Sequence, residues 1–184
     1  MIGNSAALAA ALARFEGLYP ETIELSLGRV EAALEALGRP QDRLPPVIHV
    51  AGTNGKGSTS AFMRAMAEAA GLKVHVFTSP HLVRFNERIR LAGEIVDDAR
   101  MLDWLDRTFN AAAALLAFSE VPADLLILEV GLGGRYDATN VIDQPALCVI
   151  TPVDFDHKAF LGSDIRKIAG EKAGIIRPNR PVLT

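Results

Sequence analysis

The sequence predicts an α/β fold in which a mostly parallel sheet with helices on both faces carries a P-loop. Short apolar runs at 47–50, 74–77, 125–130 and 146–150 are typical of buried strands. Segments with helical periodicity separate the first three of these runs, which is the order expected for parallel strands joined by crossover helices. A glycine-rich loop follows the first run and leads directly into a helical segment.

Length and composition are those of an ordinary globular protein, because 184 residues with 49% hydrophobic and 22% charged side chains can form a sizeable core. The formal net charge of −3 offers no bulk attraction to nucleic acid. The single cysteine, Cys148, cannot form an internal disulfide and fits a reducing compartment. The start at Met1 lacks a signal-peptide pattern and no apolar run could span a bilayer. We therefore expect a cytoplasmic protein that binds neither nucleic acid nor membranes.

The expected helices follow from caps and periodicity. One occupies residues 5–18 with Asn4 or Ser5 as its cap, and a second occupies about 27–37. The helix after the glycine-rich loop carries an apolar stripe that we expect to be buried, made of Phe62, Met63, Met66, Ala69 and Ala70.

Three further helices and a last strand are expected towards the carboxyl end. Asp97 or Asp98 caps a helix that is followed by an alanine-rich helix at about 109–118. Ser163 or Asp164 caps the last helix. The run 182–184 begins another strand, so the sheet is predicted to be incomplete at its carboxyl end.

The stretch from His49 to Thr59 has the features of a phosphate-binding loop. Its glycines let the backbone approach a polyphosphate, and the helix that begins near Ser58 points its positive end at the anion. Lys56 would supply a charge to the outer phosphates, and Ser58 or Thr59 would supply a hydroxyl to a phosphate or to Mg²⁺. We assign nucleotide binding to Asn54, Gly55, Lys56, Gly57, Ser58 and Thr59.

This loop departs from the usual P-loop pattern at two positions. The pattern has a glycine where this chain has Val50, and a hydroxyl residue where it has Gly57. A plain glycine-rich turn between a strand and a helix is the alternative interpretation.

Polar residues also follow the other predicted strands, where ligands collect in doubly wound sheets. Ser79 comes after the run 74–77, Glu129 ends the most apolar run, and His157 follows the run 146–150. A carboxylate at the end of an apolar strand is where nucleotide-hydrolysing folds hold Mg²⁺. We expect Ser79, Glu129, His157 and Lys172 to meet the phosphate loop at one sheet edge.

Several ordered motifs carry a resemblance to a known family. They are Gly52-Thr-Asn-Gly-Lys-Gly-Ser58, Thr78-Ser-Pro-His81, Glu87-Arg-Ile89, Glu129-Val-Gly-Leu-Gly-Gly-Arg135, Asp137-Ala-Thr-Asn140, Asp156-His157 with Phe160-Leu-Gly162, and Glu171-Lys-Ala-Gly174. From about Thr22 to Thr184 the chain resembles the folylpolyglutamate synthase/dihydrofolate synthase family, which belongs to the Mur ligase superfamily.

The resemblance implies a division of the chain into amino-terminal helices packing on the core (1–46) and part of an ATP-binding central domain (47–184). The carboxyl-terminal ligase domain of the family would be absent. It also implies a monomer whose partners are dihydropteroate or folates, glutamate and ATP. In that chemistry ATP phosphorylates a carboxylate, and the amino group of glutamate then attacks the acyl phosphate to form an amide.

Roles for individual residues follow from the same resemblance. Ser79 and Glu129 would bind the first of two Mg²⁺ ions and His157 the second. Lys56, His157 and Lys172 would be catalytic, with Lys172 carbamylated. The implied substrate-binding residues are Pro80, His81, Arg135 and Asp137.

The chain also departs from the family, which usually has a Thr-x-Phe-Glu segment where Thr108-Phe109-Asn110 here runs directly into Ala111. Three other functions remain open from the sequence. They are a Mur-type ligase for cell-wall precursors, a nucleotide-binding module without full activity, and a simple kinase.

Overall fold

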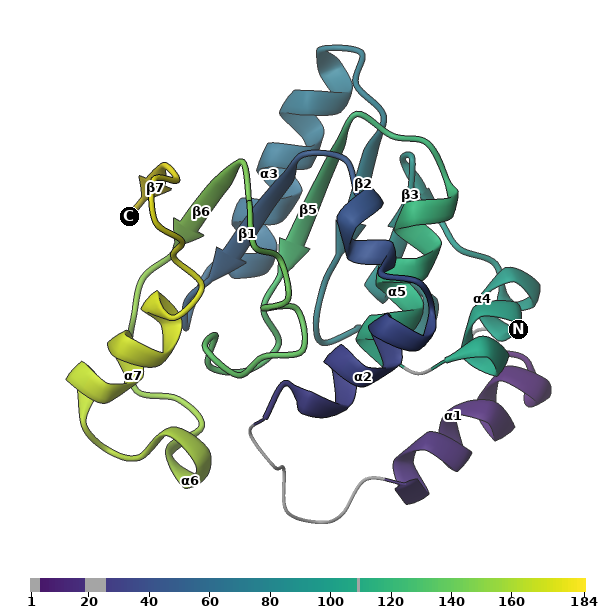
Figure 1. The fold of residues 1–184 in the computed structure, drawn as a ribbon, viewed down its shortest axis with the longest axis horizontal. Helices are drawn as coiled ribbons and strands as arrows, with labels where there is room; N and C mark the ends of the chain where they lie inside the picture. The colour runs from purple at the N-terminus through teal and green to yellow at the C-terminus, as the bar shows by residue number, and fades with distance from the viewer. Residues whose placement is uncertain (1–3, 19–25, 109) are drawn as a thin grey trace.

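The computed structural model describes residues 4–18, 26–108 and 110–184, and within them it has one mixed sheet covered by helices on both faces (Figure 1). The strands are β1 (Val47–Ala51), β2 (Val74–Phe77), β3 (Ile89–Leu91), β4 (Glu94–Ile95), β5 (Leu125–Glu129), β6 (Leu147–Ile150) and β7 (Val182–Leu183). Their order across the sheet is β4-β3-β2-β5-β1-β6-β7. The predicted fold class is therefore confirmed.

The centre of the sheet is parallel, as the sequence predicts. Strand β1 pairs in parallel with β5 on one side and β6 on the other, and β2 pairs in parallel with β5. The predicted unit of β1, helix and β2 therefore has β5 inserted between its two strands. Because Val50 pairs with Glu129, the carboxyl ends of β1 and β5 lie side by side.

A short antiparallel hairpin, β3 with β4, was not expected from the sequence. It pairs Arg90 with Ile95 and Leu91 with Glu94. Its turn consists of Ala92 (φ 48°) and Gly93 (φ 96°), the pair of positive angles that a two-residue hairpin turn needs. The hairpin extends the sheet beyond β2, since β3 pairs antiparallel with β2.

The helices agree with the expected segments, except that α6 and the two 3-10 turns were not expected. They are α1 (Ala6–Leu18), α2 (Gly28–Ala36), α3 (Lys56–Ala69), α4 (Asp98–Arg107), α5 (Asn110–Glu120), α6 (Lys158–Leu161) and α7 (Ile165–Ala173), with 3-10 turns η1 (Pro40–Arg43) and η2 (Phe85–Arg88).

Three predicted helix caps are present. Ser5 Oγ accepts from the Leu8 amide, Asp97 from the Arg100 amide, and Asp164 from the Arg166 amide. Thr22, where the family resemblance begins, and Phe109 lie outside the described residues.

Two main cores flank the sheet, and a third, minor cluster contains Ala51, Val130, Cys148 and Ile175. The larger core joins one face to the helices α1, α2, α4 and α5, with Leu8 and Leu34 fully buried in it. The smaller core packs Met63 and Ala67 of α3 against the opposite face. The amino-terminal helices thus pack on the same core as the strands, while the domain boundary at residue 46 stays a prediction.

The buried stripe predicted for α3 is right for Met63 and wrong for its other members, Phe62, Met66, Ala69 and Ala70. The side chains of Phe62 and Met66 are 71% and 64% exposed, while Ser60, Met63 and Ala67 face the sheet. The phosphate loop explains the difference, because it fixes how α3 is rotated about its axis. Gly57 lies against the end of β5, so residues three and ten positions later on the helix, Ser60 and Ala67, face the sheet too.

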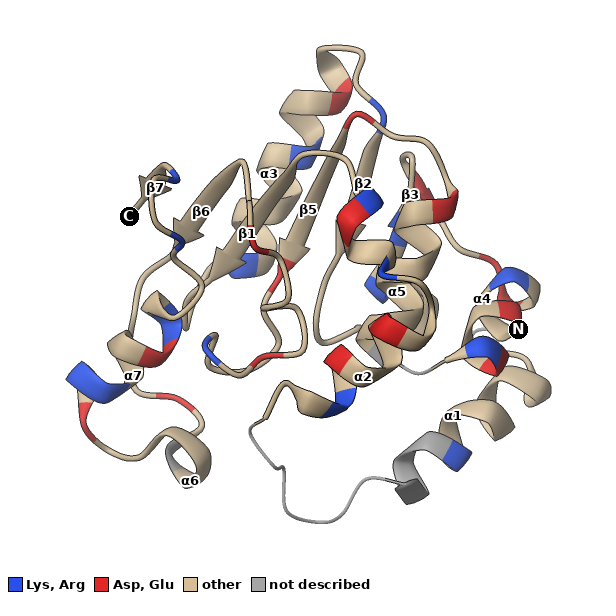
Figure 2. Cartoon of the chain, in the orientation of Figure 1, with Lys and Arg blue, Asp and Glu red and all other residues tan. Residues whose placement is uncertain are grey.

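Charged residues are distributed over the described elements. Figure 2 shows Lys and Arg interspersed with Asp and Glu along the helices and loops, with a basic start of α3 near the acidic end of β5. Among the described helices, none is long and apolar enough to cross a membrane.

Candidate nucleotide-binding site

The loop between β1 and α3 is held against the segment that follows β6. The amides of Thr53 and Asn54 both donate to the Pro152 carbonyl, at 3.0 and 3.2 Å. A Cβ at Gly52, whose φ is 152°, would collide with the Thr151 hydroxyl. Gly55 adopts the left-handed conformation (φ 83°) immediately before α3. The glycines therefore serve both close packing and the turn into the helix.

The first turn of α3 offers backbone amides to an anion. Gly55 precedes the helix and the structure has no side-chain cap there. Uncapped N–H groups at a helix start, together with the positive end of the helix dipole, form an anion-binding site. This geometry agrees with the predicted role of residues 54–59, which itself remains untested.

Two lysines converge on this loop. Lys56 Nζ donates to the carbonyls of Gly52 (3.1 Å) and Thr53 (3.3 Å). Lys172 Nζ, from α7, donates to the same Gly52 carbonyl at 3.0 Å. One carbonyl shared by two lysines leaves positive charge beside the loop, which favours an anion there.

Lys172 is buried, with 3% of its surface exposed, so it is not a charge on the helix surface. Burial lowers the pKa of its ammonium group, and the nearby charge of Lys56 lowers that pKa further, against an opposing effect of Asp156. The turn after β5 packs closely on α7 next to Lys172, because a Cβ at Gly134 would lie 2.6 Å from the Glu171 carbonyl oxygen. A lowered pKa favours the neutral, nucleophilic amine.

Glu129 ends β5 beside the phosphate loop and is also buried, with 3% exposed. Burial raises the pKa of its carboxyl group to about 7, although Lys56 and the amide of Ser79 act in the opposite direction. Its Oε2 atom finds no hydrogen-bond partner among the described residues. A buried carboxylate oxygen without a partner costs free energy, and native proteins keep such an atom where a ligand satisfies it.

The surroundings of Glu129 fit a divalent cation. Carboxylate and hydroxyl oxygens suit Mg²⁺, and Ser79 contributes both an amide near Glu129 and a hydroxyl. Gly57 leaves space on the other side, where a Cβ would lie 3.9 Å from Glu129 Oε2. Ser79 and Glu129 are therefore the predicted metal ligands that the structure brings together.

His157 is not brought to Glu129. Its ring lies 3.5 Å from Asp156 Oδ2 and about half of its side chain is exposed, at the start of α6. Among the described residues no three His, Cys, Asp or Glu side chains form a cluster that could hold a metal. Its role with a second ion stays a prediction.

The residues that follow Ser79 point in different directions. Pro80 is exposed and joined to Ser79 by a cis peptide bond. His81 turns towards η2, where its Nδ1 atom accepts from Arg88 Nε at 3.0 Å and its ring meets Phe85 edge-on.

Asp137 organises the turn after β5. Its Oδ2 accepts from the amides of Gly131 (3.0 Å) and Leu132 (2.8 Å), and its Oδ1 accepts from the amide and hydroxyl of Thr139 at 3.0 and 2.6 Å. Both oxygens of this predicted substrate residue are thus used within the chain.

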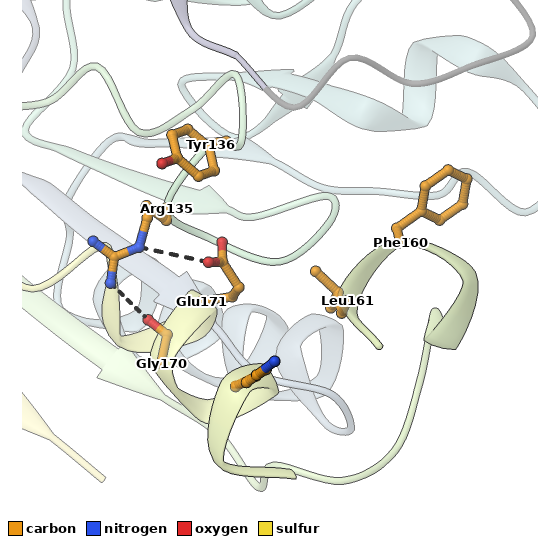
Figure 3. A pocket seen from close by; sticks show the side chains of 7 residues that line it. Arg135, Tyr136, Phe160, Leu161, Gly170 and Glu171 are labelled. Carbon is orange, nitrogen blue, oxygen red and sulfur yellow. Dashed lines mark hydrogen bonds and ion pairs between the residues drawn. The ribbon is translucent and has the colours of Figure 1, made fainter. Parts of the chain in front are cut away.

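Arg135 points away from this turn, towards α7. It forms an ion pair with Glu171 at 3.6 Å and donates to the Gly170 carbonyl at 3.3 Å (Figure 3). These three residues border a pocket of about 370 Å³ that Tyr136 and Phe160 also line. The pocket adjoins the helix that carries Lys172.

Comparison with known proteins identifies the family. No family model matches the chain. The chain is 42% identical over 182 residues to the dihydrofolate synthase/folylpolyglutamate synthase of Bacillus subtilis, and 40% identical over 189 residues to that of Escherichia coli. These alignments cover 88% and 96% of this chain, and 42% and 44% of the two relatives. The chain belongs to the folylpolyglutamate synthase/dihydrofolate synthase family.

Solved structures of the same family share the fold. The Escherichia coli protein FolC in complex with DHPP and ADP superposes with a TM-score of 0.88 and 39% identity. The bifunctional synthase of Yersinia pestis, complexed with AMPPNP and a Mn ion, gives 0.86 and 39%. Each covers 95% of this chain, which in turn covers 45% of either structure. The chain thus spans less than half of the length of the relatives it matches.

The sequence predicted no role for two residues that the structure makes prominent. Thr139 links Asp137 to the buried ring of His49 on β1, through a contact of 2.9 Å. Thr139 lies in the motif Asp137-Ala-Thr-Asn140, and His49 begins the loop stretch just before the first family motif. A polar residue within an apolar strand, as His49 is, was the signal that could have found this contact.

Proposed function

We propose that this chain is the ATP-binding part of a ligase that joins glutamate to dihydropteroate, to the terminal glutamate of a folate, or to both. The observation that carries the proposal is the buried, unpartnered oxygen of Glu129 next to an uncapped helix start and Lys56. The nucleotides and the Mn ion in the structures of relatives support it.

In this proposal the backbone amides at the start of α3 and the ammonium of Lys56 bind the phosphates of ATP. Ser79 and Glu129 would hold a Mg²⁺ ion, and His157 would serve a second one. Bound there, such ions would supply positive charge against the charge that develops on the transferred phosphoryl group. The γ-phosphoryl group passes to the substrate carboxylate with release of ADP. The glutamate amine then attacks the acyl phosphate, loses a proton and displaces phosphate as the amide forms.

We propose that Lys172 is carbamylated. Its lowered pKa supports this, because only the neutral amine can add to carbon dioxide. The ammonium first loses one proton, and the neutral amine loses a second as the new N–C bond to carbon dioxide forms, so a cation becomes an anion that a neighbouring divalent ion would stabilise. Intact mass spectrometry tests the modification. An unmodified mass together with full activity of Lys172→Arg would contradict it.

We propose that the folate substrate contacts the polypeptide around Pro80, His81, Arg135 and Asp137. The pocket that Arg135 borders supports a polar contact there. For Asp137, whose oxygens already accept four hydrogen bonds, the supported contribution is to shape the turn.

We further propose that residues 1–46 support a partial central domain at 47–184, and that the protein is a cytoplasmic monomer with small-molecule partners. The net charge of −3 and the single buried cysteine support this. Light scattering after size exclusion would contradict the monomer by reporting a dimer.

The decisive experiment measures ADP release with dihydropteroate or tetrahydrofolate, each with and without glutamate. Turnover that depends on glutamate with at least one of them is expected. ATP hydrolysis at a rate independent of glutamate would contradict the proposed ligase function. Phosphoryl transfer that ends at a stable phosphorylated product would contradict it too.

A further inference from the structure

The buried ring of His49 lies directly beneath the turn that follows β5. His49 has no exposed surface and sits on the face of the sheet opposite α3, since its side chain alternates with that of Val50 in the smaller core. Its Nε2 atom lies 2.9 Å from Thr139 Oγ1. Its Nδ1 atom is buried and has no hydrogen-bond partner among the described residues.

The direction of each hydrogen bond follows from the number of available protons. Asp137 accepts from three backbone amides, so its carboxylate has no proton to give. The single hydroxyl proton of Thr139 therefore goes to Asp137 Oδ1, at 2.6 Å. The Thr139 oxygen must then accept a proton from His49 Nε2. This fixes the tautomer of His49, with a proton on Nε2 and a free lone pair on Nδ1.

The ring stays neutral in this setting. Burial lowers the pKa of His49 to about 3, and the positive charge of Arg177 contributes to the lowering. Arg177 is itself held by the Ile142 carbonyl (3.1 Å) and by Asn140. The imidazole therefore acts as a hydrogen-bond donor and does not bring a charge to the turn.

The turn that this chain of bonds holds borders the candidate metal ligands. A Cβ at Gly131 would lie 3.3 Å from Asp137 Oδ2 and 3.7 Å from Ser79 Oγ. Gly131 is also only two residues beyond Glu129. A change in the direction of the Asp137 carboxylate would release the amides of Gly131 and Leu132 next to Ser79.

We propose that His49 is a positioning residue, which donates through Thr139 to orient the Asp137 carboxylate and so fixes the 131–137 turn beside Glu129 and Ser79. In this chain of hydrogen bonds, His49 Nε2–H donates to Thr139 Oγ1, and the Thr139 hydroxyl donates to Asp137 Oδ1. The amides of Gly131 and Leu132 donate to Asp137 Oδ2. Its consequence for catalysis rests on the proposed ligase function, but the positioning itself does not.

The first test is spectroscopic. In the nitrogen-15 spectrum of the chain, His49 should show a protonated Nε2 and a pyridine-type, unprotonated Nδ1 between pH 5 and 8. A proton on Nδ1 in place of Nε2, or a ring that becomes doubly protonated in this range, would overturn the proposal.

The second test removes and restores the links. Thr139→Val deletes the hydroxyl and should speed amide hydrogen exchange of Gly131 and Leu132 about tenfold relative to Ile127 in β5, the loss expected for one hydrogen bond. Thr139→Ser keeps the hydroxyl and should leave that ratio within about twofold. Equal ratios in the two variants would overturn the proposal.

A matched pair at position 49 separates positioning from packing. The glutamine amide nitrogen reaches about as far from the backbone as His Nε2, whereas that of asparagine stops at the distance of Nδ1. His49→Gln should therefore keep the exchange ratio near the wild-type value, and His49→Asn should raise it about tenfold. A raised exchange ratio in both variants, or in neither variant, would contradict the role of Nε2.

His75→Gln serves as a control, because His75 is also buried but bonds to the Val121 carbonyl and the Ala92 amide, far from the turn. It should lower overall stability without changing the Gly131 to Ile127 ratio. Failure of the ligase assay would count against the proposed function only, since none of these measurements uses ATP or folate.

Discussion

Two carboxylates near the same sheet edge differ in how they are satisfied. Asp137 accepts four hydrogen bonds from its own turn, while one oxygen of the buried Glu129 has no partner among the described residues. A satisfied carboxylate stabilises the chain, whereas an unsatisfied one destabilises it until a ligand binds. The comparison separates a residue that shapes the site from one that is available to bind.

Asp137→Ala should produce the largest change in stability. It removes the acceptor for four donors, so we expect the free energy of unfolding to fall by about 3 kcal/mol. Urea denaturation of the variant beside the wild type measures this. A loss below about 1 kcal/mol would show that the turn does not depend on its carboxylate.

Glu129→Gln should behave in the opposite way. It removes a buried charge, so the free energy of unfolding should stay unchanged or rise. Affinity for ADP with Mg²⁺ should fall about 100-fold, since a charged ligand is lost. Calorimetric titration with and without Mg²⁺ measures the effect, and equal affinities in variant and wild type would argue against a metal at this carboxylate.

Lys172→Met removes the proposed carbamate and should have a smaller effect on the same affinity, of about tenfold, because Lys56 and Glu129 still bind the phosphates and the ion. Stability should not fall, because the variant replaces a buried polar group by an apolar side chain of similar length. Thermal unfolding and calorimetry together check this. A sharp drop in the unfolding midpoint would mean that the bond to the Gly52 carbonyl stabilises the loop.

The pH dependence of stability should also distinguish the two carboxylates. The pKa of Glu129 is raised from 4.5 to about 7 in the folded chain, so between these pH values the folded form keeps a proton that the unfolded form releases. The Glu129 contribution to stability therefore falls as pH rises from about 4.5 to 7 and is constant above. Subtracting the profile of Glu129→Gln from that of the wild type should isolate this slope. A flat difference would contradict the raised pKa.

Much of the fold could be predicted because its strands are strongly apolar and its caps are explicit. The hairpin β3–β4 could not, since its strands contain three and two residues and its turn has Ala92 where an asparagine or glycine would have signalled a positive φ. The rotation of α3 was predicted wrongly, because Phe62 and Met66 form an apolar stripe as regular as the one that faces the sheet. Hydrophobic periodicity locates the apolar stripes on a helix, but the packing of the phosphate loop determines which stripe of α3 faces the sheet.

For the site, sequence order placed Ser79 and Glu129 at strand ends that the sheet then brings together. The sequence could not predict which carboxylate oxygens are hydrogen-bonded within the chain, since this depends on backbone amides several residues away. Asp137 looked like a ligand for substrate, yet Gly131, Leu132 and Thr139 already use its lone pairs. His157 pairs with its neighbour Asp156 and not with Glu129.

The most direct test of the distinction between satisfied and unsatisfied carboxylates is Mn²⁺ binding followed by electron paramagnetic resonance, with thermal unfolding of the same samples. Glu120→Gln is the matched control, because Glu120 accepts from Trp104 and Arg107 on the outside of α5. Glu129→Gln should lose Mn²⁺ binding and keep its unfolding midpoint, while Glu120→Gln should keep Mn²⁺ binding and lose a few degrees. Mn²⁺ affinity that survives Glu129→Gln, with a lowered midpoint in that variant, would contradict the account.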